Sequence, residues 1–346
     1  YDSDGCLDEA VWLREETFGA TFPGGDNETV MITDIEKAPD GDVVIAGLFH
    51  ENITIGGTTL QSQGENDLFV AKRHADGTYA WAISGGSPHG DWCSWGLGMG
   101  DNTDQCLIGD NTASPFHGDR IAVDPQGNVF VTGSFCHKHG NEAEACSAIF
   151  GDLTVEGIGY SQKTAVGFVA KVSPDGEWLW AATMDSGHSY GATLGLGIAV
   201  DSSGDAYVTG VANIASDGTA YFTGSDEEGS LDINHYIHRQ NAYLAKINST
   251  GSWLWVNPSD ASSGSNAPSS YGSDVEIGPS GDVFVMGRCS GHVRFNGTSY
   301  NCQTQSIHTN VFLIRFTDEG VPSGIMRIIE NSSCGSSYCY TSSYPG

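Results

Sequence analysis

Apolar and polar residues alternate over short segments of this chain, and turn-forming residues separate one segment from the next. One arrangement occurs four times: an alternating segment, a turn ending in Gly-Asp or Gly-Asn, and a second segment that closes on glycine. A period of two residues is typical of a half-buried strand, and a glycine-containing turn joins two such strands into a hairpin. The predicted hairpins occupy residues 32–47, 119–133, 196–210 and 273–287, with turn glycines Gly41, Gly127, Gly204 and Gly281.

A second hairpin follows each of these. It spans residues 67–82, 167–181, 242–256 and 311–325, with turn glycines Gly77, Gly176, Gly251 and Gly320. A tryptophan stands four residues after the turn glycine in three copies, at Trp81, Trp180 and Trp255, and Gly324 replaces it in the fourth. A residue that follows the repeat serves packing more often than ligand binding, so we expect these tryptophans to lie between units or along an outer strand.

The two hairpins and a variable stretch between them make a repeat of roughly 75 residues. The variable stretch contains a short apolar-Gly-apolar element at residues 52–60, 152–160 and 292–300, and a longer polar substitute around Tyr221 to Ile233. A four-stranded unit cannot bury both faces alone, whereas stacked units can. The sequence therefore predicts an all-β fold, a β-propeller with four visible four-stranded blades. The expected organisation is an acidic segment 1–8, a propeller 9–330 (strand 9–20; blades about 31–90, 118–187, 194–258 and 272–330) and a cysteine-containing tail 331–346.

Residues 9–20 resemble an isolated copy of the last strand of a unit, with Trp12 in the tryptophan position. The fourth unit is the one whose final strand is degenerate. Two interpretations stay open: the N-terminal strand completes the last blade and closes the ring, or it is donated to a neighbouring molecule and produces a polymer.

The charge balance is strongly acidic, with 43 acidic residues against 14 basic ones and a net charge of −29. Such a surface repels nucleic acids and anionic membranes, so neither is an expected partner. No apolar run approaches the roughly 20 residues of a membrane-spanning helix, and membrane insertion is not expected. The chain begins at Tyr1 rather than Met, which is typical of a processed, mature protein.

Eight of the nine cysteines fall in close pairs without the CxxC spacing of a zinc site, so they are predicted to form disulfides in an oxidising, extracellular compartment. The pairs are Cys93 with Cys106, Cys136 with Cys146, Cys289 with Cys302, and Cys334 with Cys339. Cys6 is then left over: it is free, links two chains, or bonds to one member of the C-terminal pair and displaces the other. Five glycosylation sequons agree with this compartment, at Asn27, Asn52, Asn248, Asn296 and Asn331.

The segments DPQGNVFVTG, DSSGDAYVTG, NDLFVAK and SPDGEWLW resemble the bacterial and archaeal SBBP β-propeller repeat. The resemblance covers most of residues 30–330 and implies a secreted or surface propeller without implying an activity. That family is named for seven blades, whereas four are visible here. At the N-terminus, DSDGCLDE is similar to the calcium repeats of thrombospondin type 3, which implies Asp2, Asp4 and Asp8 as ligands of a calcium ion.

Candidate chemistry outside the repeat is sparse. His137 and His139 beside Cys136, and His235 with His238, have spacings that a metal can use, although a disulfide loop and a polar insertion explain them better. The repeated acids follow the repeat, as turn residues do and a catalytic pair does not; they are Asp40, Asp42, Asp124, Asp201, Asp205 and Asp282. No catalytic residue is predicted.

Trp92 and Trp95 lie next to and within the loop that the predicted Cys93–Cys106 disulfide would close, where they are candidates for binding a glycan or a partner protein or for filling the mouth of the propeller. The favoured hypothesis is a non-enzymatic extracellular structural or adhesive protein that associates with itself into a filament or layer, or with surface glycans or other surface proteins. A lectin-like propeller is the alternative, and a polysaccharide-acting enzyme ranks below both.

Overall fold

The computed structural model describes the repeat region of the chain. The described residues are 30–88, 120–135, 147–157, 165–186, 192–213, 220–225, 231–233, 240–261, 270–289, 291–302 and 310–327. Within them every element is a β-strand, and no helix is long and apolar enough to cross a membrane. The all-β prediction is confirmed.

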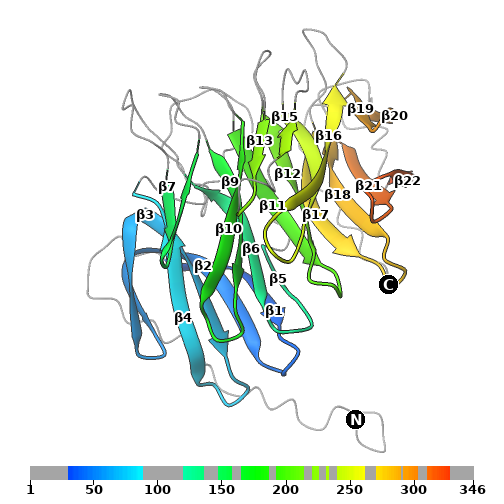
Figure 1. Cartoon of the computed structure of the whole chain (residues 1–346). Coiled ribbons are helices and arrows are strands. Elements are labelled where there is room, and N and C mark those ends of the chain that lie inside the picture. Colours follow the sequence, from blue (N-terminus) through cyan, green and yellow to red (C-terminus); the bar gives the residue numbers. More distant parts are fainter. Residues whose placement is uncertain are drawn as a thin grey trace, which may run out of the picture.

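Four antiparallel sheets stand next to one another as the blades of a β-propeller (Figure 1). Blade 1 contains β1 (Val30–Lys37), β2 (Val43–Ile55), β3 (Thr58–Arg73) and β4 (Tyr79–Gly86). Blade 2 contains β5 (Ile121–Val123), β6 (Val129–Phe135), β9 (Val166–Val172) and β10 (Trp178–Asp185). Blade 3 contains β11 (Ala192–Val200), β12 (Ala206–Asn213), β15 (Gln240–Ile247) and β16 (Trp253–Ala261). Blade 4 contains β17 (Ser270–Ile277), β18 (Val283–Cys289), β21 (Asn310–Phe316) and β22 (Pro322–Arg327).

The glycine turns form the predicted hairpins. All eight turn glycines have a positive φ, from 77° at Gly320 to 93° at Gly77, which is a conformation that L-residues with a side chain avoid. In each turn the glycine N–H donates to the carbonyl three residues earlier, as Gly127 does to Asp124 at 2.9 Å. The spacing of glycine in the sequence thus sets the register of both hairpins in every unit.

A third hairpin in each later unit joins the sheet of the preceding blade. These hairpins are β7 (Ser147–Phe150) with β8 (Leu153–Glu156), β13 (Ala220–Thr223) with β14 (Leu231–Ile233), and β19 (Gly291–Phe295) with β20 (Thr298–Cys302). Strand β7 pairs with β4, β13 with β10, and β19 with β16, so the first three sheets each have six strands and the fourth has four. Each of the first three blades therefore receives two strands from the unit that follows it.

In blade 1 the corresponding hairpin is the far end of β2 and β3. A bulge at Glu51, whose φ is 64°, interrupts the pairing, and residues Asn52–Ile55 then pair with Thr58–Gln61. Ile53 and Ile55 of this hairpin are buried with Phe49 and Phe69 of the same blade. The hairpin is consequently packed on its own blade.

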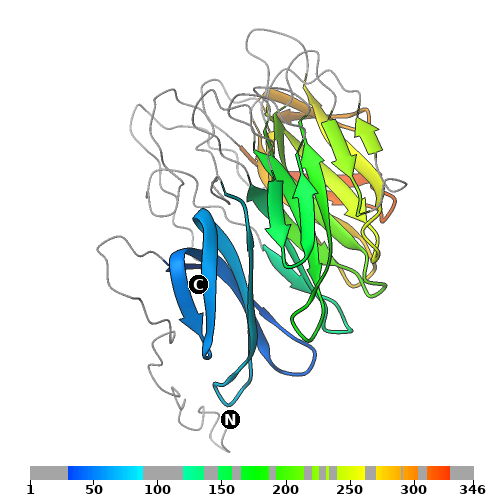
Figure 2. The ribbon, with the colours of Figure 1, turned by 60° about the vertical axis from the view of Figure 1, so that its left-hand side comes forward.

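The hydrophobic core consists of layers between successive blades. Ala46 and Val70 of blade 1 share one cluster with Val131 and Ala170 of blade 2. Similar clusters join blade 2 to blade 3 and blade 3 to blade 4. Among the described residues no hydrophobic cluster joins blade 4 to blade 1, and blades 2 and 3 lie between these two end blades along the row (Figures 1 and 2).

Candidate functional site

A cation on the third strand of each blade reaches the acidic turn of its first hairpin. These ion pairs join Lys72 with Asp40 at 2.5 Å and Asp42 at 3.5 Å, Lys171 with Asp124 at 3.7 Å, Lys246 with Asp201 and Asp205 at 3.4 Å each, and Arg315 with Asp282 at 2.6 Å. These are the repeated acids of the sequence, and the structure brings all six to cations of the repeat.

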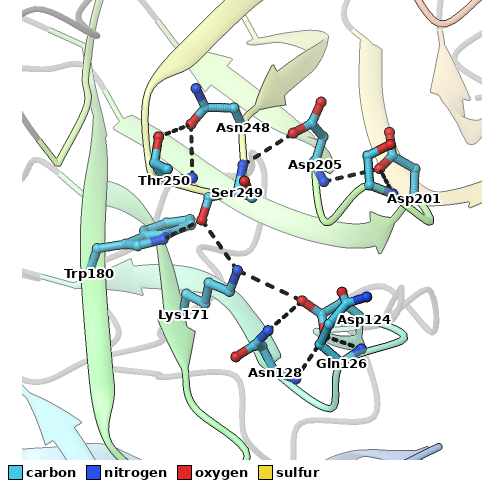
Figure 3. A network of polar contacts seen from close by, with 11 residues as sticks. Asp124, Gln126, Asn128, Lys171, Trp180, Asp201, Asp205, Asn248, Ser249 and Thr250 are labelled. Atoms are coloured by element: carbon cyan, nitrogen blue, oxygen red, sulfur yellow. Dashed lines mark hydrogen bonds and ion pairs between the residues drawn. The ribbon is translucent and has the colours of Figure 1, made fainter.

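Asp124 shows why these carboxylates belong to turns. Its Oδ1 accepts the N–H groups of Gln126 at 3.0 Å and Asn128 at 2.8 Å, and its Oδ2 accepts the side-chain amide of Asn128 at 2.7 Å (Figure 3). Asp40 and Asp201 hold the N–H two residues ahead in the same manner. A carboxylate that satisfies turn amides and a cation is a structural group, which agrees with the prediction of turn residues.

The pair of blade 2 is the most enclosed. The side chains of Asp124 and Lys171 are 1% and 8% exposed. Desolvation lowers the pKa of Lys171, and the nearby carboxylate of Asp124 opposes that shift. The ammonium also lies 4.7 Å from the centre of the Phe130 ring, so it is held by an ion pair and a cation–π contact together.

The repeated tryptophans join one blade to the next. Trp180 of β10 donates its indole N–H to the carbonyl of Ser249 at 3.1 Å, and Lys171 donates to the same oxygen at 3.2 Å (Figure 3). Ser249 lies in the second hairpin turn of blade 3, and its own N–H donates to Asp205 at 3.1 Å. We call the indole, the lysine and this turn carbonyl the inter-blade latch.

The indole–carbonyl bond of the latch recurs between blades 1 and 2, where the indole of Trp81 donates to the carbonyl of Pro174 at 2.8 Å. Pro174 and Ser249 each stand two residues before the turn glycine of their hairpin. At the third junction the Trp255 ring lies against Gly320, and Asn257 donates to the Gly320 carbonyl at 2.8 Å. The expectation that the tryptophans pack between units is confirmed.

The inner strands of all four blades surround a hollow of about 180 Å³. Glu36 of β1 and Glu276 of β17 line it together with apolar residues of β5 and β11. Burial raises the pKa of Glu36, and the carboxylates of Asp34 and Glu276 add to the effect. A charged carboxylate is therefore disfavoured there.

Arg120 lies beside these strands and is buried, and its desolvation lowers its pKa to about 10. Its Nη1 donates to the Gly195 carbonyl of blade 3 at 2.9 Å, while its N–H and that of Ile121 donate to Asp34 of blade 1. Three blades are bonded through this single residue, which sequence analysis missed because nothing repeats at its position.

The end faces of the row differ from the internal ones. We call the side of a blade that faces the preceding unit its leading face, and the opposite side its trailing face. Ile35 on the leading face of blade 1 is 63% exposed, whereas its counterparts Ile121, Ile198 and Val275 are 1%, 2% and 1% exposed. All four pair with the corresponding residue of the second strand, so their equivalence rests on register.

The trailing face of blade 4 is also less covered than its counterparts. Phe284 and Leu313 are half-buried there, while Phe130 and Val169 at the same positions of blade 2 are 0% exposed. Gly324 occupies the place of the latch tryptophan and is exposed. Periodicity could not reveal either face, because exposure here depends on what adjoins the first and last units.

Most of the other predicted site residues lie outside the described part of the chain. These are Asp2, Asp4, Cys6, Asp8, Asn27, Trp92, Cys93, Trp95, Cys106, Cys136, His137, His139, Cys146, His235, His238, Asn331, Cys334 and Cys339. Within the described residues, no group of three or more potential ligands is placed to hold a metal ion.

Cys289 is buried and disulfide-bonded, and its pairing with Cys302 stays a prediction. Three sequons are described. Asn296 is exposed at the tip of the β19–β20 hairpin, Asn52 lies half-buried in β2, and the Asn248 side chain accepts bonds from Thr250 and Ser252 in a turn. Asn296 is thus the most accessible acceptor of the three.

Together, the stacked antiparallel sheets and the latches define a β-propeller repeat protein. No family model matches the chain. A stretch of 258 residues, 73% of the chain, is 23% identical to an uncharacterized WD repeat-containing protein, L264, of Acanthamoeba polyphaga mimivirus. WD repeats form four-stranded propeller blades, so this distant similarity agrees with the fold. The chain spans 16% of that relative's length.

Proposed function

We propose that this protein is a non-enzymatic, extracellular structural propeller that associates with copies of itself through its two end blades. The observation that carries the proposal is the 63% exposure of Ile35 at a position that is nearly inaccessible in every later blade. Burying a side chain of this size contributes about 2 kcal/mol, so a partner surface at this face is favourable.

The partner surface that best fits the leading face of blade 1 is the trailing face of blade 4 in a second copy. The internal junctions already join a trailing face to a leading face three times. Contact between two different faces of one molecule is heterologous, and such contacts extend into filaments unless the rotation closes a ring. The assembly that we propose is therefore a surface filament or layer.

The proposed junction between two molecules would differ in detail from the junctions between successive blades of one molecule. Gly195 and Gly272 allow Thr132 and Thr209 of the preceding blade to approach closely, whereas blade 1 has Ile32 at that position, 48% exposed. An isoleucine there holds the partner further away. The junction between copies would therefore be looser and more readily reversible than an internal one.

Location outside the cell is supported by the disulfide at Cys289 and by the accessible sequon at Asn296. Adhesion to surface glycans or other surface proteins, and calcium binding at Asp2, Asp4 and Asp8, belong to the same proposal. The absence of a catalytic role is supported by the repeated carboxylates, which hold turn amides and cations.

Negative-stain electron microscopy and sedimentation of the full chain over a concentration range, with and without a calcium chelator, test the proposal. We expect filaments or sheets, and we expect Ile35→Asp to abolish them, because an unpaired charge in an apolar interface is strongly unfavourable. Leu179→Asp is the matched control, since Leu179 is 46% exposed on an outer strand away from both end faces. Uniform single particles at every concentration would overturn self-assembly, and equal loss in both variants would overturn the assigned face.

A further inference from the structure

We infer that residues 9–20 form a strand that pairs with the outer edge of Asn52–Ile55 and seats Trp12 against blade 1. This inference holds for an isolated molecule and does not depend on assembly. The docking surface is the outer edge of Asn52–Ile55 in β2, and the segment that binds there lies upstream in the same chain.

The first argument is a rule that the other three units obey. In each, the first strand of the third hairpin pairs with the outer strand immediately upstream in the chain. The equivalent pairs are Gly85 with Phe150, Met184 with Phe222, and Ser259 with Phe295. The segment upstream of the first unit that has the character of an outer strand is 9–20.

Position within the strand gives the expected register. The partners Gly85, Met184 and Ser259 each stand four residues after the tryptophan of their strand. The counterpart of Phe150 and Phe295 in blade 1 is Ile55, the last residue before the hairpin turn. Four residues after Trp12 comes Glu16, so Glu16 is expected opposite Ile55.

The edge of blade 1 is ready for a strand. Asn52–Ile55 pairs on one side with Thr58–Gln61, and no strand of the described ranges pairs on its other side. Ile53 and Ile55 are 0% and 1% exposed, which fixes the segment against its own blade. A strand that is packed in place and has unpaired N–H and C=O groups along one edge pairs readily with another strand, and natural proteins cover such edges.

The latch supplies an independent argument. Its acceptor is the carbonyl two residues before the turn glycine of the following unit, Pro174 for Trp81 and Ser249 for Trp180. In the first unit this residue is Ala75, two residues before Gly77. An indole at Trp12 would complete the same latch by donating to Ala75.

Chain length permits the connection. Strand β11 begins 12 residues after Trp180, and β17 begins 15 residues after Trp255. Strand β1 begins 18 residues after Trp12, which is slightly longer than either of these two linkers. The segment can therefore reach the position of a preceding outer strand without strain.

Hydrogen exchange measured by mass spectrometry tests the pairing. The full chain is compared with a chain that begins at residue 21, both at a concentration where sedimentation shows a monomer. We expect truncation to accelerate exchange in a peptide covering Asn52–Ile55 at least tenfold and to leave a peptide covering Ser147–Phe150 unchanged, since β4 still pairs there. Equal exchange in the two chains would overturn the inference.

Two further measurements separate loss of pairing from loss of folding. Glu16→Pro in the full chain removes a backbone donor within the segment and should reproduce the faster exchange, whereas Asp8→Pro, outside the segment, should not. A synthetic peptide of residues 9–20 added to the truncated chain should restore protection. Protection of the full chain that appears only as its concentration rises would assign the strand to a second copy and would overturn pairing within one chain.

Discussion

The indole N–H of Trp180 donates a 3.1 Å hydrogen bond to the carbonyl of Ser249, and so bonds the outer strand of blade 2 to a turn of blade 3. The ring itself is 7% exposed and packs edge-on against Phe130 at 5.9 Å. One side chain thus connects its own blade, the inter-blade core and the next blade.

Replacing Trp180 should separate these contributions. Trp180→Phe removes the indole N–H and keeps most of the apolar surface, and we expect a loss of about 1 kcal/mol. Trp180→Ala also opens a cavity between blades 2 and 3 and should lower the free energy of unfolding by about 3–5 kcal/mol. Urea denaturation measures both, with Leu179→Ala on the same strand as a control that should change stability by less than about 0.5 kcal/mol. A similar loss for the control would contradict a specific latch.

The ion pairs of the repeat should differ in energetic weight according to burial. Lys171→Met leaves the carboxylate of Asp124 enclosed without its cation, and we expect a loss of about 3 kcal/mol because an uncompensated buried charge is strongly unfavourable. Arg315→Met removes the equivalent pair of blade 4, whose arginine side chain is 51% exposed, and its effect should fall within experimental error. Thermal and urea unfolding measure both losses. Equal losses of stability in the two variants would show that burial does not determine how much each ion pair contributes.

Two turn glycines offer a matched pair of substitutions. Gly41 and Gly176 have φ values of 92° and 85°, so alanine is strained at both by about 1–2 kcal/mol. Around Gly41 an added Cβ meets no atom within 4 Å, whereas at Gly176 it would lie 2.7 Å from the ring of Trp81. Gly176→Ala should therefore be distinctly more destabilising, and the excess should shrink when Trp81 is already alanine. An unchanged difference in that double variant would contradict contact with the indole.

Replacing Glu36 by a neutral residue should stabilise the protein at neutral pH and not at acid pH. Burial raises its pKa, so the folded state binds this proton more tightly than the unfolded state, and ionised Glu36 destabilises the fold above that pKa. As the pH falls through the folded-state pKa, the penalty is relieved. Glu36→Gln should raise the unfolding temperature at pH 7, and the gain over the parent should vanish near pH 4. Exposed Glu177→Gln is the control, and a gain of the same size at both pH values would contradict the assignment to ionisation.

The two main hairpins of each unit could be predicted because glycine spacing and strand alternation are local signals. Gly127 and Gly204 have the positive φ expected of them. The attachment of the third hairpin to the preceding blade could not be predicted. It rests on two or three residue pairs, such as Gly85 with Phe150, which leave no periodic trace in the sequence.

The candidate site also has one part that could be predicted from the sequence and one part that could not. The tryptophans were recognisable because they repeat, but their acceptors are backbone carbonyls of Pro174 and Ser249, and any residue supplies a carbonyl. The significance of Ile35 was hidden for the opposite reason. It matches its counterparts in type and differs from them only in having no described blade before it.

The pairing of each third hairpin with the blade before it has a mechanical meaning. A force applied along the row of blades passes from one blade to the next through these hairpins, which pair in one sheet but belong along the chain to the following unit, as well as through side-chain packing. No unit between the ends can be pulled out without tearing strands from its neighbour. The row should therefore yield as one cooperative body under tension, rather than blade by blade.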